Sequence, residues 1–138
     1  MTASPNRLVA TVVGALYLVF GLLGFTVASA FGFAATSGGL LFGVIQVNNL
    51  QNIVHLVIGV VLVIVARFGV AKAKSANATI GTLFLVFGLV GVFLSGSDSN
   101  ILALNGAANA LHFATAIVLL AVSLGAEKAT PSQKATKG

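Results

Sequence analysis

Long stretches without charge are the feature that most restricts how this chain can fold. No Asp, Glu, Lys or Arg occurs between Arg7 and Arg67, a gap of 59 residues. Two further gaps separate Lys74 from Asp98, with 23 residues, and Asp98 from Glu127, with 28 residues. A helix needs roughly 20 apolar residues to cross a bilayer, so the first gap accommodates two spans and each of the others accommodates one. We therefore predict an all-α fold, a bundle of four transmembrane helices.

The composition supports a membrane protein. Hydrophobic residues make up 58% of the chain and charged residues only 7%, whereas about a quarter of the residues of a soluble domain are charged. The apolar runs do not alternate as transmembrane strands do, so a helical bundle is favoured. No cysteine is present, which excludes disulfides, thiolate metal ligands and thiol catalysis.

The chain divides into a short polar lead at 1–7, one membrane domain at 8–126 and a tail at 127–138 that is predicted to be disordered and cytoplasmic. The uncharged segment between the first two spans is predicted to lie on the membrane surface or to dip back into the membrane, with Leu40–Ile45 as its interfacial part. The four spans are expected at 8–28, 49–68, 77–94 and 105–125.

The first span also has features of a secretion leader, since Ala28-Ser29-Ala30 resembles a signal-peptidase site after the basic Arg7. The apolar run is longer than the usual leader, and its sequence has an internal counterpart at Ile80–Gly91. We therefore expect a retained helix, and cleavage after Ala30 stays open.

Positive residues are confined to three places. They lie before the first span, between the second and third spans, and in the tail; the other two connections have none. The positive-inside rule then predicts a multi-pass protein of the cell membrane with both termini in the cytoplasm. Because the net charge of +5 is explained by orientation, it does not indicate nucleic-acid binding. The seven residues are Arg7, Arg67, Lys72, Lys74, Lys128, Lys134 and Lys137.

Two patterns suggest that the chain is a tandem repeat of two helical hairpins. The first and third spans share a glycine spacing with an offset of 67 residues, and the second and fourth share Asn-x₃-Asn-x₂-His with an offset of 57. Both hairpins start on the same side of the membrane, which makes this a parallel repeat. Small residues allow close helix packing in lipid. The glycines expected to do so are Gly14, Gly21, Gly24, Gly59, Gly81, Gly88 and Gly91.

The two Asn/His motifs are the candidate functional site. Each set falls within an arc of about 60° on one helical face, and both faces are predicted to turn inward and meet. Asn48 and Asn105 are good helix N-cap residues, while the histidines lie roughly 10 Å deeper. The predicted polar cluster within the membrane is Asn48, Asn52 and His55 with Asn105, Asn109 and His112.

Several readings of this cluster remain open, of which the first is structural hydrogen bonding that fixes helix register. A second is ligation of haem b or a metal by His55 and His112, although no basic residue is available for haem propionates and no carboxylate for a metal. A third is binding of a small amphipathic molecule such as a quinone, lipid or glycan carrier, beside Phe20 and Phe87, with Tyr17 within reach. A fourth is docking of a membrane protein partner.

Catalysis is not expected. No Asp or Glu lies within any predicted span, so a proton relay or a carboxylate-oriented nucleophile has no acidic partner. The chain is therefore predicted to be a non-enzymatic membrane component with no metal site, binding the lipid bilayer and a membrane protein partner or a small amphipathic ligand.

The segments Leu41–Gly59 and Leu104–His112, with their paired Asn-x₂-His motifs, resemble the domain of unknown function 4383 family. The resemblance extends from about Arg7 to Leu124. The resemblance implies a small four-helix protein of the inner membrane with no assigned activity. Members of this family are mostly actinobacterial. Members often have a histidine near the position of Gln51, and the glutamine here argues against a multi-histidine metal site.

Overall fold

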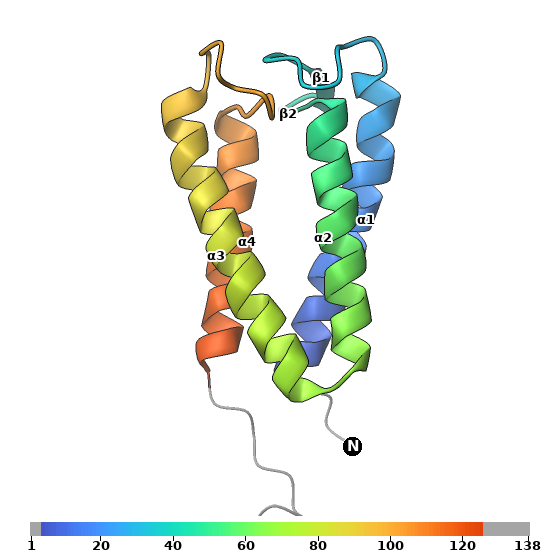
Figure 1. Ribbon diagram of the computed structural model, residues 1–138, viewed down its shortest axis with the longest axis vertical. Helices are drawn as coiled ribbons and strands as arrows, with labels where there is room; N and C mark the ends of the chain where they lie inside the picture. Colours follow the sequence, from blue (N-terminus) through green and yellow to red (C-terminus); the bar gives the residue numbers. More distant parts are fainter. Residues whose placement is uncertain (1–3, 126–138) are drawn as a thin grey trace, which may run out of the picture.

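The computed structural model describes residues 4–125, which form four helices and two short strands. Figure 1 shows two helical hairpins side by side, in which α1 packs along α2 and α3 packs along α4. The predicted all-α four-helix bundle is confirmed, and all four helices are long and apolar enough to cross a membrane. The elements are α1 (Pro5–Ala28), β1 (Gly39–Leu41), β2 (Ile45–Val47), α2 (Asn49–Arg67), α3 (Val70–Leu94) and α4 (Gly106–Leu124).

Polar side chains mark the start of three helices. The Ser4 hydroxyl accepts a hydrogen bond from the backbone N–H of Arg7, and Pro5 follows as the first helical residue. The Asn48 carboxamide accepts from the N–H of Gln51 at 2.8 Å, and Asn105 accepts in the same way from Ala108 at 2.9 Å. Both asparagines are the N-caps that the sequence predicts.

α3 is longer than the span expected at 77–94, because it begins at Val70. Gly69 precedes it with a φ of 114°, a value that favours glycine and allows the chain to reverse directly after α2. Lys72 and Lys74 therefore lie in the first turns of a continuous helix. Charge in the sequence marks where a membrane span ends, whereas the helix itself continues beyond that point.

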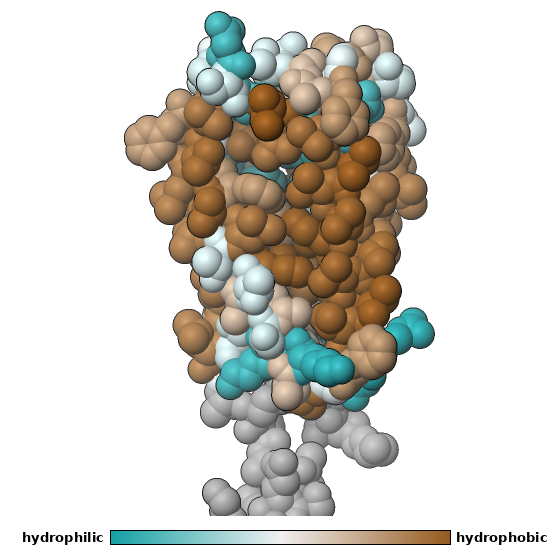
Figure 2. Space-filling view, in the orientation of Figure 1, coloured by the Kyte–Doolittle hydropathy of each residue, from teal (hydrophilic) through white to brown (hydrophobic). Residues whose placement is uncertain are grey.

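The two ends of the bundle differ in chemistry. The cap end carries β1, β2 and the loop 95–105, and the basic end carries Arg7, Arg67, Lys72 and Lys74. Figure 2 shows a broad hydrophobic surface between a hydrophilic rim at each end. This is the surface expected of a bundle whose sides face lipid.

The connection between α1 and α2, which the sequence predicts to lie on the membrane surface, contains a β-hairpin. Gly39 pairs with Val47, and Leu41 with Ile45, in antiparallel register. The turn places Phe42 and Gly43 at positive φ, with values of 52° and 76°. Leu41 and Val47 of the β-hairpin are buried against Ala28 of α1. The β-hairpin therefore closes the cap end of the first helical hairpin.

Glycines on α1 and α3 allow close helix packing within each hairpin. A Cβ on Gly14 would lie 2.9 Å from the carbonyl oxygen of Gly59 on α2, and one on Gly81 would lie 2.9 Å from Leu120 on α4. Gly21 fits against Leu56, and Gly88 fits against Phe113. At these four glycines a side chain would therefore clash with the neighbouring helix of the same hairpin.

Candidate functional site

His55 on α2 and His112 on α4 meet across the interface between the two hairpins. Their ring centroids are 5.9 Å apart and the ring planes make an angle of 81°. Both side chains are buried, with exposed fractions of 2% and 1%. Because the Asn-x₃-Asn-x₂-His pattern places each histidine on the inward face of its helix, this meeting follows from the sequence.

Aromatic rings surround the histidine pair. Tyr17 lies against His55 at a centroid distance of 4.9 Å, and Phe84 lies against His112 at 5.3 Å. Tyr17 and Phe84 also contact each other at 4.6 Å, and Phe87 lies 5.9 Å from His112. The five rings form one continuous packed group in the centre of the bundle.

The imidazole nitrogens have no hydrogen-bond partner among the described residues. Most buried polar atoms in proteins have a hydrogen-bond partner. Burying a polar atom without one costs about 1–3 kcal/mol in the free energy of folding. The four nitrogens of His55 and His112 are therefore suited to bind trapped water or a polar group of a small molecule.

A hydroxyl pair joins the two hairpins beside the rings. The Tyr17 and Thr115 hydroxyls lie 2.8 Å apart and are both buried. By the repeat offsets, Tyr17 corresponds to Phe84 and Thr115 corresponds to Ile58. The pair equivalent to Tyr17 and Thr115 is therefore Phe84 and Ile58, which is apolar. The sequence did not single out Thr115, although its spacing of three residues from His112 places it on the same helical face.

Asn52 and Asn109 do not join the histidines. The carboxamide of Asn52 points at Gly24 on α1, where it occupies the space that a Cβ would need, and Asn109 does the same at Gly91 on α3. Only glycine leaves room for the carboxamide at these two positions, since a Cβ would overlap it. The predicted six-residue cluster thus separates, and each inner asparagine ties together the two helices of its own hairpin.

Asn48 and Asn105 connect the cap end instead. Besides capping α2, the Asn48 amide donates to the carbonyl oxygens of Ala35 and Ile101, at 2.8 and 2.7 Å. The Asn105 amide donates to the carbonyl oxygen of Val44 at 2.9 Å. Each asparagine therefore hydrogen-bonds to the loop of the other hairpin and holds the two loops together.

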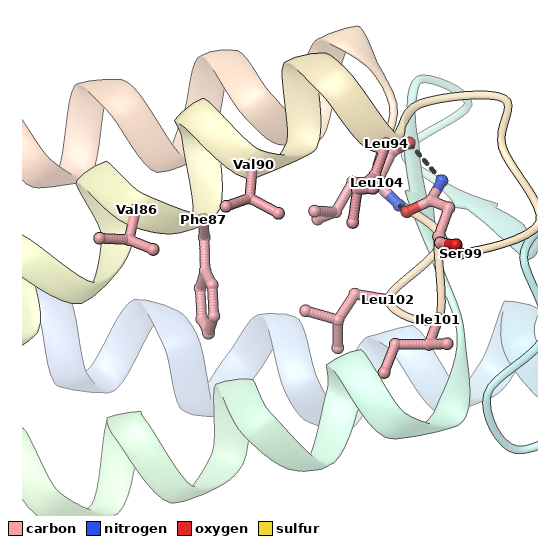
Figure 3. Close-up of a pocket in the computed structure, with 9 residues that line it drawn as sticks. Val86, Phe87, Val90, Leu94, Ser99, Ile101, Leu102 and Leu104 are labelled. Carbon is pink, nitrogen blue, oxygen red and sulfur yellow. Dashed lines mark hydrogen bonds between the residues drawn. The ribbon is translucent and has the colours of Figure 1, made fainter.

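A half-open apolar pocket lies at the cap end of the second hairpin (Figure 3). Its volume is about 280 Å³. α3 forms one wall of the pocket, and the loop before α4 forms the other. Two hydrogen bonds of 2.9 Å between the Asn100 side chain and the backbone of Leu104 hold this loop in place. The lining residues are Val86, Phe87, Val90, Leu94, Ser99, Asn100, Ile101, Leu102 and Leu104.

Phe87 links the pocket to the buried rings, because it lines the pocket and also contacts His112. Its counterpart in the first hairpin, Phe20, is covered by the ring of Phe42 at a centroid distance of 5.9 Å. Counting by the offset of 57, the residue that corresponds to Phe42 is Ser99, which lines the pocket. The first hairpin thus has a phenyl ring in contact with Phe20 where the second hairpin has Ser99, which lines the pocket together with Phe87. Of the residues predicted to line a ligand cleft, Phe87 lines this pocket, whereas Phe20 and the six residues of the Asn/His motifs do not.

Residues 4–125 contain no group of three or more His, Cys, Asp or Glu side chains placed to hold an ion. His55 and His112 stand as a pair, and a closed metal site usually has four ligands.

Four helices, each long and apolar enough to cross a membrane, surround a buried ring cluster, an arrangement consistent with a multi-pass membrane protein. Residues 7–125 match the family described as Domain of unknown function (DUF4383), and the chain belongs to that family. No curated protein and no solved structure matches the chain.

Proposed function

We propose that this protein is a non-enzymatic membrane component that binds the hydrocarbon chain of a lipid-like molecule in the pocket of its second hairpin. The observation that carries the proposal is the pocket itself, which is apolar and half-open and lies between α3 and the loop before α4. Pockets for drug-sized ligands are roughly 300–1,000 Å³. At about 280 Å³ the volume suits a single narrow chain.

The orientation in the membrane forms part of this proposal. Arg7, Arg67, Lys72 and Lys74 lie at the basic end, and the described part of the cap end has no lysine or arginine. The positive-inside rule then supports a cytoplasmic basic end, a cap end outside the cell membrane and cytoplasmic termini. Because the chain has no cysteine, Lys72→Cys and Asp98→Cys give clean labelling sites. An impermeant maleimide should label only the cysteine at 98 in intact cells. Labelling at 72 would contradict this orientation and indicate the opposite one.

Packing around the histidines argues against the alternative of a haem b or quinone redox subunit. Tyr17, Phe84 and Phe87 fill the space around the imidazoles, and a porphyrin needs a wide flat slot between its axial ligands. A quinone ring would have to displace Phe87 to reach His112. Water bound between structural histidines is the simpler role, and the purified protein should accordingly show no Soret band.

Native mass spectrometry of the detergent-purified protein tests chain binding. Val90→Trp places a large ring in the pocket and should reduce the fraction of protein that retains a lipid. Leu23→Trp is the matched control, because Leu23 occupies the equivalent position of α1 and has nearly the same exposure, 40% against 42%. Equal lipid retention in both variants would contradict the proposal.

A further inference from the structure

The rim of the pocket carries the only acidic side chain of residues 4–125. Asp98 directly precedes Ser99, which lines the pocket, and it is exposed. All four lysines and arginines of this range lie at the basic end. No cation at the described cap end is therefore available to balance Asp98.

The same rim has an unused hydrogen-bonding group. The Ser97 hydroxyl oxygen is buried and has no partner among the described residues. Its backbone carbonyl accepts from the N–H of Asn100, which lines the pocket, so Ser97 is held against the pocket wall. The exposed carboxylate of Asp98, next to Ser97 in the chain, offers oxygens that can accept hydrogen bonds.

We infer that the pocket selects a lipid whose headgroup carries a primary ammonium, with the chain in the pocket and the ammonium at Asp98. This inference rests on the proposed function and names its ligand class. A chain that enters at the cap end of α3 leaves its headgroup at the level of the rim, because helix ends and headgroups lie at the same depth. The ammonium donates hydrogen bonds to the carboxylate, whereas a quaternary ammonium has no N–H to donate.

Charge at the rim also disfavours anionic lipids. A phosphate-bearing headgroup without an ammonium is usually bound by arginine or lysine, and the described cap end has neither. Asp98 would repel it. The expected preference is about twofold to fivefold, as for an exposed ion pair.

Fluorescence quenching by brominated lipids tests this selection, because the chain has no tryptophan and a single engineered one is the only reporter. Phe93→Trp lies next to Leu94 of the pocket, does not line the pocket and replaces a ring that is 82% exposed. The protein is placed in phosphatidylcholine bilayers with a minor fraction of brominated phosphatidylethanolamine or brominated phosphatidylglycerol. Thr26→Trp, at the equivalent position of α1, reports random mixing.

Quenching of the reporter at 93 should exceed that at 26 with brominated phosphatidylethanolamine, and the excess should vanish when Asp98→Asn is added. Equal excess with both brominated lipids would overturn headgroup selection and leave chain binding intact. A greater excess with phosphatidylglycerol would also overturn selection. No excess with either lipid would overturn both chain binding and selection.

Discussion

The two helical hairpins share their internal packing and differ in what covers them. In each, an asparagine of the second helix fits onto a glycine of the first, Asn52 onto Gly24 and Asn109 onto Gly91. At the cap end, the first hairpin carries a β-hairpin whose Phe42 covers Phe20, whereas the shorter loop of the second leaves a pocket beside Phe87. The shared contacts hold the helices of each hairpin together, and the difference in the loops coincides with the pocket where we propose that a lipid chain binds.

The asparagine–glycine contact gives the largest expected effect. Gly24→Ala would place a methyl group where the Asn52 carboxamide lies, and the overpacking should cost about 2–3 kcal/mol in the free energy of unfolding. Gly91→Ala should cost a similar amount through Asn109. Thermal denaturation in detergent measures the effect.

Two variants separate this clash from a general effect of alanine. Gly106→Ala is the control, because nothing lies within 4 Å of a Cβ at that position. Truncating the partner in Gly24→Ala/Asn52→Ala should recover most of the lost stability. A double variant as unstable as the sum of its single variants would show that the two residues do not interact.

The hydroxyl pair is the second difference between the halves, and its effect should be smaller. Tyr17→Phe leaves the buried Thr115 hydroxyl without its partner, which should cost about 0.6–1.7 kcal/mol, the range for hydrogen bonds between helices in membranes. Adding Thr115→Ile, which copies the apolar pair of the other half, should restore stability. If Tyr17→Phe is neutral in the same melting assay, the bond does not join the hairpins.

Substitutions at Ser99 and Phe42 should give the smallest effect, a change of about threefold in lipid binding. A lipid chain gains little binding free energy when it leaves other lipid chains for an apolar pocket. Ser99→Phe should close the pocket and reduce retained lipid in native mass spectra. Phe42→Ser should expose Phe20 and increase it. Changes of the same sign in the two variants would mean that the comparison between Phe42 and Ser99 is misplaced.

Much of the architecture follows from the sequence. Charge gaps predict four helices, and the spacing of Asn and His predicts that His55 and His112 meet, as their 5.9 Å separation bears out. Periodicity defines a helical face, yet a face in a bundle touches two neighbours. It therefore did not reveal that Asn52 points at α1 while His55, three residues later, points at α4.

Other features could not be read from local patterns. The pocket depends on a loop conformation that places Leu102 and Leu104 opposite α3, and apolar composition alone does not fix that path. The β-hairpin at 39–47 is too short and too apolar to show strand alternation. The pocket could have been located by comparing equivalent positions of the two halves, since Phe42 in the first half corresponds to Ser99 in the second.

Photo-crosslinking with a lipid that carries a diazirine on its acyl chain, followed by mapping of the labelled peptides, tests the central claim most directly. Adducts should concentrate on 86–104, which contains the pocket walls, and should be several-fold fewer on the equivalent segment 19–47 of the first hairpin. Equal labelling of the two segments would contradict a binding pocket in the second hairpin.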